Sequence, residues 1–265
     1  MNLQSSTYLP GMPARSMNIL GVQVANPDQR EAIDMLASVI AEKRFTKVAF
    51  LNAHSANTAV DDPEFASILS SFLVLPDGIG VDMAAKFLYG APFRENLNGT
   101  DFVPALLAAI QSPLTVGIIG AIRENGERAT RDLRESMPQH RFVYLNDGYL
   151  DPQEESVVIQ QISELKPDVL LVAMGVPRQE KWIDAKLSGQ DCTVPIAVGA
   201  LLDFLSGAVP RAPRIMRRLR IEWVYRLCRE PGRLWRRYIL GNPVFLTRIT
   251  LQKFGAGKSG TDDHA

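Results

Sequence analysis

The segment 76–82, with the sequence PDGIGVD, contains residue types suited to acid–base chemistry at a ligand site. It follows the apolar run Phe72–Leu75, which predicts a buried strand, and it precedes apolar residues at helical spacing. Asp77 is therefore expected in a strand-to-helix turn, where Gly78 and Gly80 permit a close approach of a ligand. A carboxylate in such a turn acts either as a general base or as a cap for the following helix, and the turn alone leaves both interpretations open.

Apolar runs alternate with helical patterns from residue 18 to about residue 210. Strands are expected at Asn18–Val24, Lys47–Leu51, Phe72–Leu75, Leu114–Gly120, Phe142–Leu145, Asp168–Met174 and Val194–Val198. Such alternation is typical of parallel sheets. The sequence therefore predicts an α/β fold with a Rossmann-like, mostly parallel sheet that carries helices on both faces.

Polar residues follow several of these strands. They are the segment Asn52–Asn57, then Asp77, the pair Gln179 and Glu180, and Asp203. Because the carboxyl ends of parallel strands meet at one edge of a sheet, these residues are expected to lie close together and to form a ligand site. The polar loop 94–102 contributes Thr100, which is expected to cap the next helix, and Asp101.

The composition is that of an ordinary soluble protein. The 265 residues are 46% hydrophobic and 22% charged, enough for a sizeable core, and a formal net charge of zero gives no indication of a nucleic-acid partner. The two cysteines lack metal-ligand spacing and favour a reducing compartment. No D-x-D pair indicates a metal-bound nucleotide, and neither a metal nor a cofactor is expected. Residues 1–17 lack a signal-peptide pattern and are expected to be a flexible leader.

The zero net charge conceals an asymmetry. Residues 211–241 contain ten arginines and two acidic residues, a formal charge of +8 that the rest of the chain balances. Strand patterns stop near Pro210, so residues 18–210 are expected to form the catalytic domain, residues 211–254 a helical appendage and residues 255–265 a disordered tail. A solvated helix is one interpretation of the arginines. The near absence of lysine and the interleaved aromatic residues favour a phosphate or an anionic membrane surface as their partner.

Five segments in a fixed order carry a family resemblance. They are PDGIGVD, NGTDF, GVPRQEKWI, VGALLDF and RRLRIEWVYRLCREPGRLWRRYILGNP. Over roughly residues 18–250, the chain resembles the WecG/TagA/CpsF glycosyltransferases. The resemblance implies transfer of a sugar from a UDP-sugar to a polyprenyl-diphosphate-linked sugar, with inversion, in bacterial surface polysaccharide synthesis. It also implies peripheral binding to the inner face of the cytoplasmic membrane. The donor sugar stays open between glucose, N-acetylmannosamine and its uronic acid.

The resemblance also implies roles for individual residues. Asp77 is expected to be the general base, and Gln179 and Asp203 are expected beside the nucleotide sugar. The other candidate substrate-binding residues are Asn52, Asn57, Thr100, Asp101 and Glu180, together with the appendage residues Arg226, Arg233 and Arg236, which are expected to hold a diphosphate. Some family members carry a threonine at the end of the strand before the Asn cluster, whereas FLNAHSAN has none there. His54 is a lone histidine near the expected site, and a structural role is its simplest interpretation.

Two other functions compete with a transferase. A nucleotide-dependent oxidoreductase would need a glycine fingerprint after the first strand, which the sequence GVQVANP at 21–27 lacks. A non-enzymatic membrane-binding module would account for the arginines but would leave the polar strand ends without a role.

Overall fold

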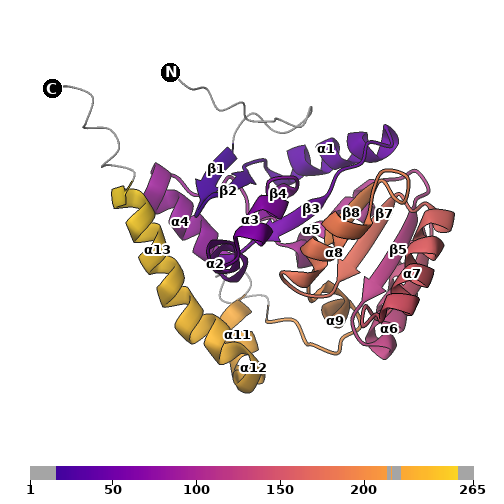
Figure 1. Cartoon of the computed structure of the whole chain (residues 1–265). Helices are drawn as coiled ribbons and strands as arrows, with labels where there is room; N and C mark the ends of the chain where they lie inside the picture. Colours follow the sequence, from indigo (N-terminus) through magenta and orange to yellow (C-terminus); the bar gives the residue numbers. More distant parts are fainter. Residues whose placement is uncertain (1–15, 214–215, 217–221, 256–265) are drawn as a thin grey trace.

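The sheet at the centre of the molecule is parallel, as expected. The structure, a computed structural model, describes residues 16–213, 216 and 222–255. Six strands hydrogen-bond in the order β4-β3-β8-β7-β5-β6 (Figure 1). They are β3 (Val48–Leu51), β4 (Leu73–Pro76), β5 (Thr115–Gly120), β6 (Arg141–Asn146), β7 (Val169–Ala173) and β8 (Val194–Ala197). Each one falls where a continuous apolar run predicts a strand, which confirms the α/β architecture.

The first expected strand, Asn18–Val24, is wrong. Leu20 and Gly21 have φ angles of 51° and 90°, so the chain turns there. The result is a hairpin of β1 (Ser16–Ile19) and β2 (Val22–Ala25), paired antiparallel and separate from the six-stranded sheet. Glycine tolerates a positive φ without strain, and the turn therefore forms at the one glycine in this segment.

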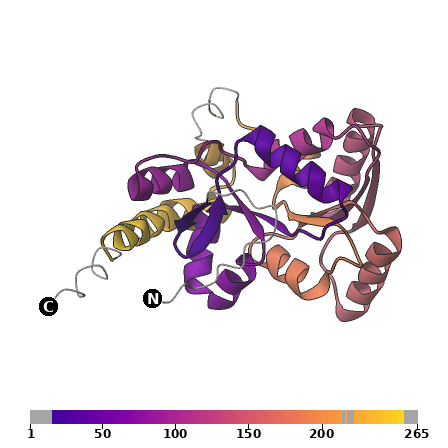
Figure 2. The same ribbon diagram turned by 90° about the horizontal axis from the view of Figure 1, so that it is seen from above.

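Helices cover both faces of the sheet (Figures 1 and 2). One face packs against α1 (Gln29–Ala41), α5 (Gly99–Ala109), α6 (Arg123–Ser136) and α9 (Leu201–Leu205). The other packs against α2 (Ala53–Asp61), α3 (Pro63–Leu69), α4 (Ile79–Tyr89), α7 (Pro152–Leu165) and α8 (Arg178–Lys186). Successive strand residues point to opposite faces: Phe50 joins the first apolar cluster and Leu51 the second. Loops at the strand ends are thus held on a rigid, doubly covered sheet.

The C-terminal part is helical, as expected. Its described elements are α11 (Glu222–Arg229), α12 (Pro231–Trp235), the π-helix η1 (Arg236–Leu240) and α13 (Gly241–Gly255). Helix α13 runs beside α2 and α4 (Figure 1), and its Phe245 and Ile249 are buried in the second apolar cluster. Asn57 donates a hydrogen bond of 2.8 Å to the carbonyl of Gly241, and Arg248 pairs with Asp61 of α2. These contacts anchor α13 to the sheet domain.

The division of the chain into domains stays a prediction. Of the expected leader, residues 1–15 lie outside the described part of the chain, and so do residues 256–265 of the expected tail. Within the described residues, no helix combines the length and the apolar character that crossing a bilayer requires.

Candidate active site

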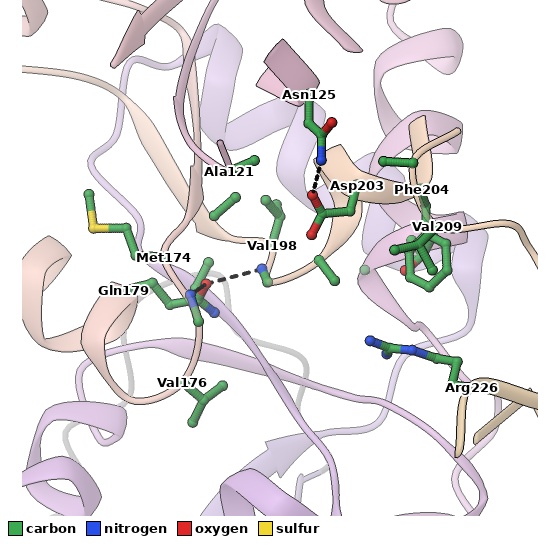
Figure 3. A pocket seen from close by; sticks show the side chains of 18 of the residues that line it. Ala121, Asn125, Met174, Val176, Gln179, Val198, Asp203, Phe204, Val209 and Arg226 are labelled. Carbon is green, nitrogen blue, oxygen red and sulfur yellow. Dashed lines mark hydrogen bonds between the residues drawn. The ribbon is translucent and has the colours of Figure 1, made fainter. Parts of the chain in front are cut away.

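A cavity of about 1040 Å³, here called the main cavity, lies at the carboxyl ends of the strands (Figure 3). All six strands of the sheet send a loop to it. The lining residues after β3, β4, β5, β6, β7 and β8 include, in that order, Asn52, Asp77, Ala121, Asp147, Gly175 and Gly199. The polar strand ends do meet at one edge of the sheet, where ligands bind in folds of this type.

Asp77 lies in the turn after β4, half-buried against the main cavity. Its backbone N–H donates to the carbonyl of Leu51 on the neighbouring strand (2.9 Å), and its Oδ2 accepts from the amide of Asn52 (3.2 Å). Burial raises the pKa of Asp77. The Asn52 hydrogen bond and the charges of Arg237 and Arg226 act in the opposite direction. The Asp77 carboxylate is thus a stronger base than an exposed aspartate, and it forms no capping hydrogen bond with α4.

Capping is the wrong interpretation of Asp77. Helix α4 begins at Ile79 with Gly78 as its N-cap, and no side chain forms a capping hydrogen bond there. Gly78 has a φ of 91°, and its N–H donates to Asn96 Oδ1 (2.6 Å). The backbone N–H at the start of α4 is therefore hydrogen-bonded by a residue from another loop and not by Asp77. The Asp77 side chain therefore does not cap α4, and it lines the main cavity.

Asn52 and Asn57 have different surroundings although both were candidates. Asn52 caps α2 through Oδ1, which accepts from the N–H groups of His54 (3.0 Å) and Ser55 (3.1 Å), while its Nδ2 donates to Asp77. Asn57 lies outside the main cavity and ties α2 to α13. Asn52 thus orients the Asp77 carboxylate, whereas the contacts of Asn57 hold two helices together.

Gln179 joins two loops of the main cavity. Its Oε1 accepts from the N–H groups of Gly175 and Gly199, each at 3.1 Å, and its Nε2 donates to Glu180 Oε1 at 2.8 Å. Figure 3 shows Gln179 among the lining residues of the cavity. Both side chains are 2% exposed, but only Gln179 lines the cavity. Burial raises the pKa of Glu180 to about 7. Glu180 therefore lies behind the lining and fixes which way the Gln179 amide faces.

Asp203, in the first turn of α9, also lines the main cavity. Its Oδ1 accepts from Asn125 Nδ2 of α6 at 2.8 Å (Figure 3). Asn125 was not a candidate, although it follows the end of β5 by five residues and the position of the strand ends could have indicated it as it did Asp203. The pair offers a carboxylate oxygen and an amide to polar groups of a ligand.

A second cavity of about 590 Å³, here called the apolar cavity, adjoins the first. Its apolar lining comes from α4, α11, η1 and α13: Ile79, Met83, Trp223, Tyr238, Ile239, Pro243, Phe245 and Leu246. The two cavities share seven lining residues: Asn52, His54, Asp77, Thr100, Phe204, Arg226 and Arg237. Asp77 therefore lies where a polar and an apolar chamber meet.

Thr100 lines both cavities, and Asp101 lines the apolar one. Thr100 is not the helix cap. Asn98 caps α5, with its Oδ1 accepting from the Asp101 N–H at 3.0 Å. Asp101 in turn pairs with Arg211 at 2.8 Å. The capping position lies two residues earlier than expected because asparagine competes well for it.

Some arginines of the C-terminal helices line the two cavities, and others lie outside them. Arg226 and Arg237 line both cavities, and the Arg226 guanidinium lies 5.2 Å from the centre of the Phe204 ring, which holds it toward the main cavity. Arg236 is exposed and lies over Trp235 at 5.4 Å, outside both cavities. The side chain of Arg233 lies outside the described part of the structure. Arg237, missed as a candidate, occupies the place expected for Arg236.

The fold and the site together define the class of protein. The model of the glycosyl transferase WecG/TagA/CpsF family matches residues 17–259, and the chain belongs to this family of glycosyltransferases. The family membership rules out the oxidoreductase and the non-enzymatic membrane module as the main function. Among the described residues, no group of three or more potential metal ligands is gathered together.

Two curated relatives show the similarity in detail. An N-acetylglucosaminyldiphosphoundecaprenol N-acetyl-beta-D-mannosaminyltransferase of Bacillus spizizenii is 35% identical over 206 residues, which cover 76% of this chain and 77% of the relative. An enzyme of the same name from Staphylococcus aureus is 29% identical over 241 residues, 89% of this chain and 93% of the relative.

Proposed function

We propose that the protein transfers a sugar, with inversion, from a UDP-sugar to a polyprenyl-diphosphate-linked sugar, and that Asp77 is the general base. The observation that carries this proposal is the place of Asp77. Its carboxylate lies at the junction of a polar and an apolar cavity, facing two arginines.

The main cavity suits the donor nucleotide sugar. Its volume of about 1040 Å³ is large enough for a nucleotide sugar, since small-molecule pockets span about 300–1,000 Å³. Asn125 and Asp203 present hydrogen-bonding groups for a nucleoside, and the Gln179-linked glycine loops line the same chamber. Arg226 and Arg237 provide positive charge where the diphosphate would lie toward Asp77.

The apolar cavity suits the acceptor. Aromatic and aliphatic side chains line it together with Asp77 and Arg237. A lipid-linked sugar would place its isoprenoid against the apolar lining and its sugar beside the carboxylate. In that arrangement the diphosphate of the acceptor comes within the field of the same arginines.

The chemistry follows from this arrangement. Asp77 accepts the proton of the acceptor hydroxyl as the oxygen attacks the anomeric carbon from the side opposite UDP, so the configuration inverts. A raised pKa makes the carboxylate a stronger base than an exposed aspartate. Negative charge develops on the departing UDP, and Arg226 and Arg237 offset it. The proposed reaction therefore needs no metal ion, and its rate is expected to be unchanged by a chelator.

An anionic membrane surface is the proposed site of action. Helix α13 and the adjoining α4 expose a set of large apolar side chains: Met83, Phe87, Val244, Leu246, Leu251 and Phe254. Met83 and Leu246 of this surface also line the apolar cavity, so a membrane-held lipid would have a short path into it. We place the enzyme peripherally on the inner face of the cytoplasmic membrane.

The membrane proposal has a direct test. Leu251→Glu combined with Phe254→Glu should reduce sedimentation with phosphatidylglycerol vesicles, while UDP affinity is unchanged. Val157→Glu provides the control, because Val157 is also a largely exposed apolar residue but lies on α7, far from α13 (Figure 1). Equal vesicle binding by the double variant and the control would contradict this membrane surface.

The test of the reaction is a donor panel with a short-chain polyprenyl-diphosphate-linked N-acetylglucosamine as acceptor. UDP-N-acetylmannosamine is the first donor to try, because both relatives are named as N-acetylmannosaminyltransferases. UDP-glucose and the uronic acid donor complete the panel. Acceptor-dependent UDP release and a product of inverted anomeric configuration are expected with one donor. A product of retained configuration would contradict a single-displacement mechanism with one base.

A further inference from the structure

His54 differs from an ordinary structural histidine. The buried His140 shows the contrast: its Nδ1 accepts from the Leu114 N–H at 3.2 Å, and its Nε2 bonds to the Leu107 carbonyl at 2.8 Å. The His54 ring, in contrast, has no hydrogen-bond partner among the described residues. Only its backbone is bonded, to Asn52 and Thr58. The two ring nitrogens of this half-buried side chain are thus available to a ligand that enters the site.

The ring stands at a meeting point of cavities. His54 lines the main cavity, the apolar cavity and a groove of about 500 Å³ between α2 and η1. Its neighbours at the junction are Asp77 and Arg237, the proposed base and one of the proposed diphosphate-binding arginines. Because the backbone hydrogen bonds of α2 hold the residue in place, the ring is presented to whatever occupies the junction.

The charge state of His54 decides what it can do there. Burial, with the nearby charge of Arg237, lowers the pKa of His54 to about 4. The ring is therefore neutral at neutral pH and is a poor base, while burial raises the pKa of Asp77. A neutral imidazole offers one N–H donor and one nitrogen acceptor, the complement of a sugar hydroxyl or acetamido group.

We propose that His54 is a specificity-determining residue that hydrogen-bonds to a hydroxyl or acetamido group of the sugar held at the junction. The inference rests on the proposed transferase function, and it adds a residue that selects the sugar. That sugar belongs either to the donor or to the lipid-linked acceptor, and the two sources share the same chemistry.

The test compares ligands that differ in the sugar. Affinities for UDP, UDP-N-acetylmannosamine and a short-chain polyprenyl-diphosphate-linked N-acetylglucosamine are measured by calorimetry for the wild type, His54→Leu and His54→Gln. His54→Leu should weaken one of the two sugar-bearing ligands about 10- to 100-fold while UDP affinity stays within about twofold. His54→Gln keeps a donor and an acceptor and should recover part of the loss. Val60→Ala, an exposed position on the same helix, controls for general effects on α2.

The ligand that loses affinity identifies the source of the sugar. Unchanged affinity for both sugar-bearing ligands would overturn the inference. An equal loss for UDP itself would also overturn it, because that pattern indicates a structural role. These are binding measurements, so they remain decisive if the wild type transfers no sugar, an outcome that would instead contradict the proposed function.

Discussion

Replacing Arg237 with alanine tests how the C-terminal helices take part in catalysis. Arg237 lines both cavities, and its charge acts on Asp77. Removing one preorganised group that stabilises developing charge costs about 100- to 1,000-fold in rate, or about 2.7–4 kcal/mol. We expect a loss of that size in kcat/KM for Arg237→Ala, measured from initial rates of acceptor-dependent UDP release.

The adjacent Arg236 supplies the matched control. Arg236→Ala removes the same charge one residue away, but this side chain is exposed, lies over Trp235 and lines neither of the two cavities. Exposed charges contribute little, so its kcat/KM should fall by less than about fivefold. Equal losses in the two variants would refute the assignment of Arg237 to the site and would indicate a general electrostatic effect.

The pH dependence of kcat/KM in Arg237→Ala provides a second test of the interaction between Arg237 and Asp77. The Arg237 charge lowers the pKa of Asp77 against the effect of burial. Without that charge, the pKa of Asp77 rises, because the ionised carboxylate loses a favourable neighbour. The acidic limb of the kcat/KM profile reports the base in the free enzyme, so it should move to higher pH in Arg237→Ala. A limb that moves to lower pH would contradict this coupling.

Three further substitutions test the walls of the site. Glu180→Gln should remove a pH dependence of stability. Folding raises the pKa of Glu180 from 4.5 to about 7, so urea denaturation of the wild type should show about 3 kcal/mol lost as the pH rises through that range, with no further loss from Glu180 above it. A wild type and variant with the same pH slope would contradict it. Gln179→Leu leaves the N–H groups of two loops unpaired and should cost about 2–4 kcal/mol in the same assay and weaken UDP binding; stability within about 0.5 kcal/mol of wild type would contradict it. Phe204→Ala removes the half-buried ring against which Arg226 lies and should lower kcat/KM about 3- to 30-fold, and full activity would contradict the positioning role.

The sheet could be predicted from the sequence because its strands are buried on both faces. Runs such as VLLVA at 169–173 are apolar throughout, which is typical of strands in a parallel sheet covered on both faces. The hairpin at 16–25 escaped prediction because its turn depends on two positive φ angles in a segment of the same apolar character. A local pattern of apolar residues does not report backbone conformation at a single glycine.

The site could be predicted only where it follows directly from strand ends. Asn52 and Asp77 directly follow a strand, and Gln179 and Asp203 lie six residues after one. Because the carboxyl ends of parallel strands share one edge of the sheet, these residues come together in the main cavity. The arginines could not be placed in this way. Glu230 has φ −128° and ψ 58°, so the chain changes direction between α11 and α12. Helical spacing therefore does not carry over from Arg226 to the arginines beyond Pro231.

Asn96 and Asn125 show the other limit of the sequence. Asn96 lies in the loop between α4 and α5, and Asn125 lies on α6. Each joins the site through a partner distant in sequence: Gly78 for Asn96 and Asp203 for Asn125. Asn57 is the opposite case: it belongs to the polar cluster after β3, but its side chain bonds to Gly241 and does not line the main cavity. Which asparagine in a polar segment faces the cavity depends on helix phase and on what packs behind it.

The measurement that most directly tests the central claim compares the turnover of Asp77→Asn with that of the wild type, using the donor that the panel identifies. Asparagine keeps the shape of the side chain and an oxygen for the Asn52 hydrogen bond, but it cannot accept the proton. General-base catalysis contributes about 100- to 10,000-fold, so kcat should fall by that factor while the affinity for UDP changes less than about threefold. If Asp77→Asn keeps a tenth or more of the wild-type kcat, Asp77 is not the base, and the junction of the two cavities is not where the proton is removed.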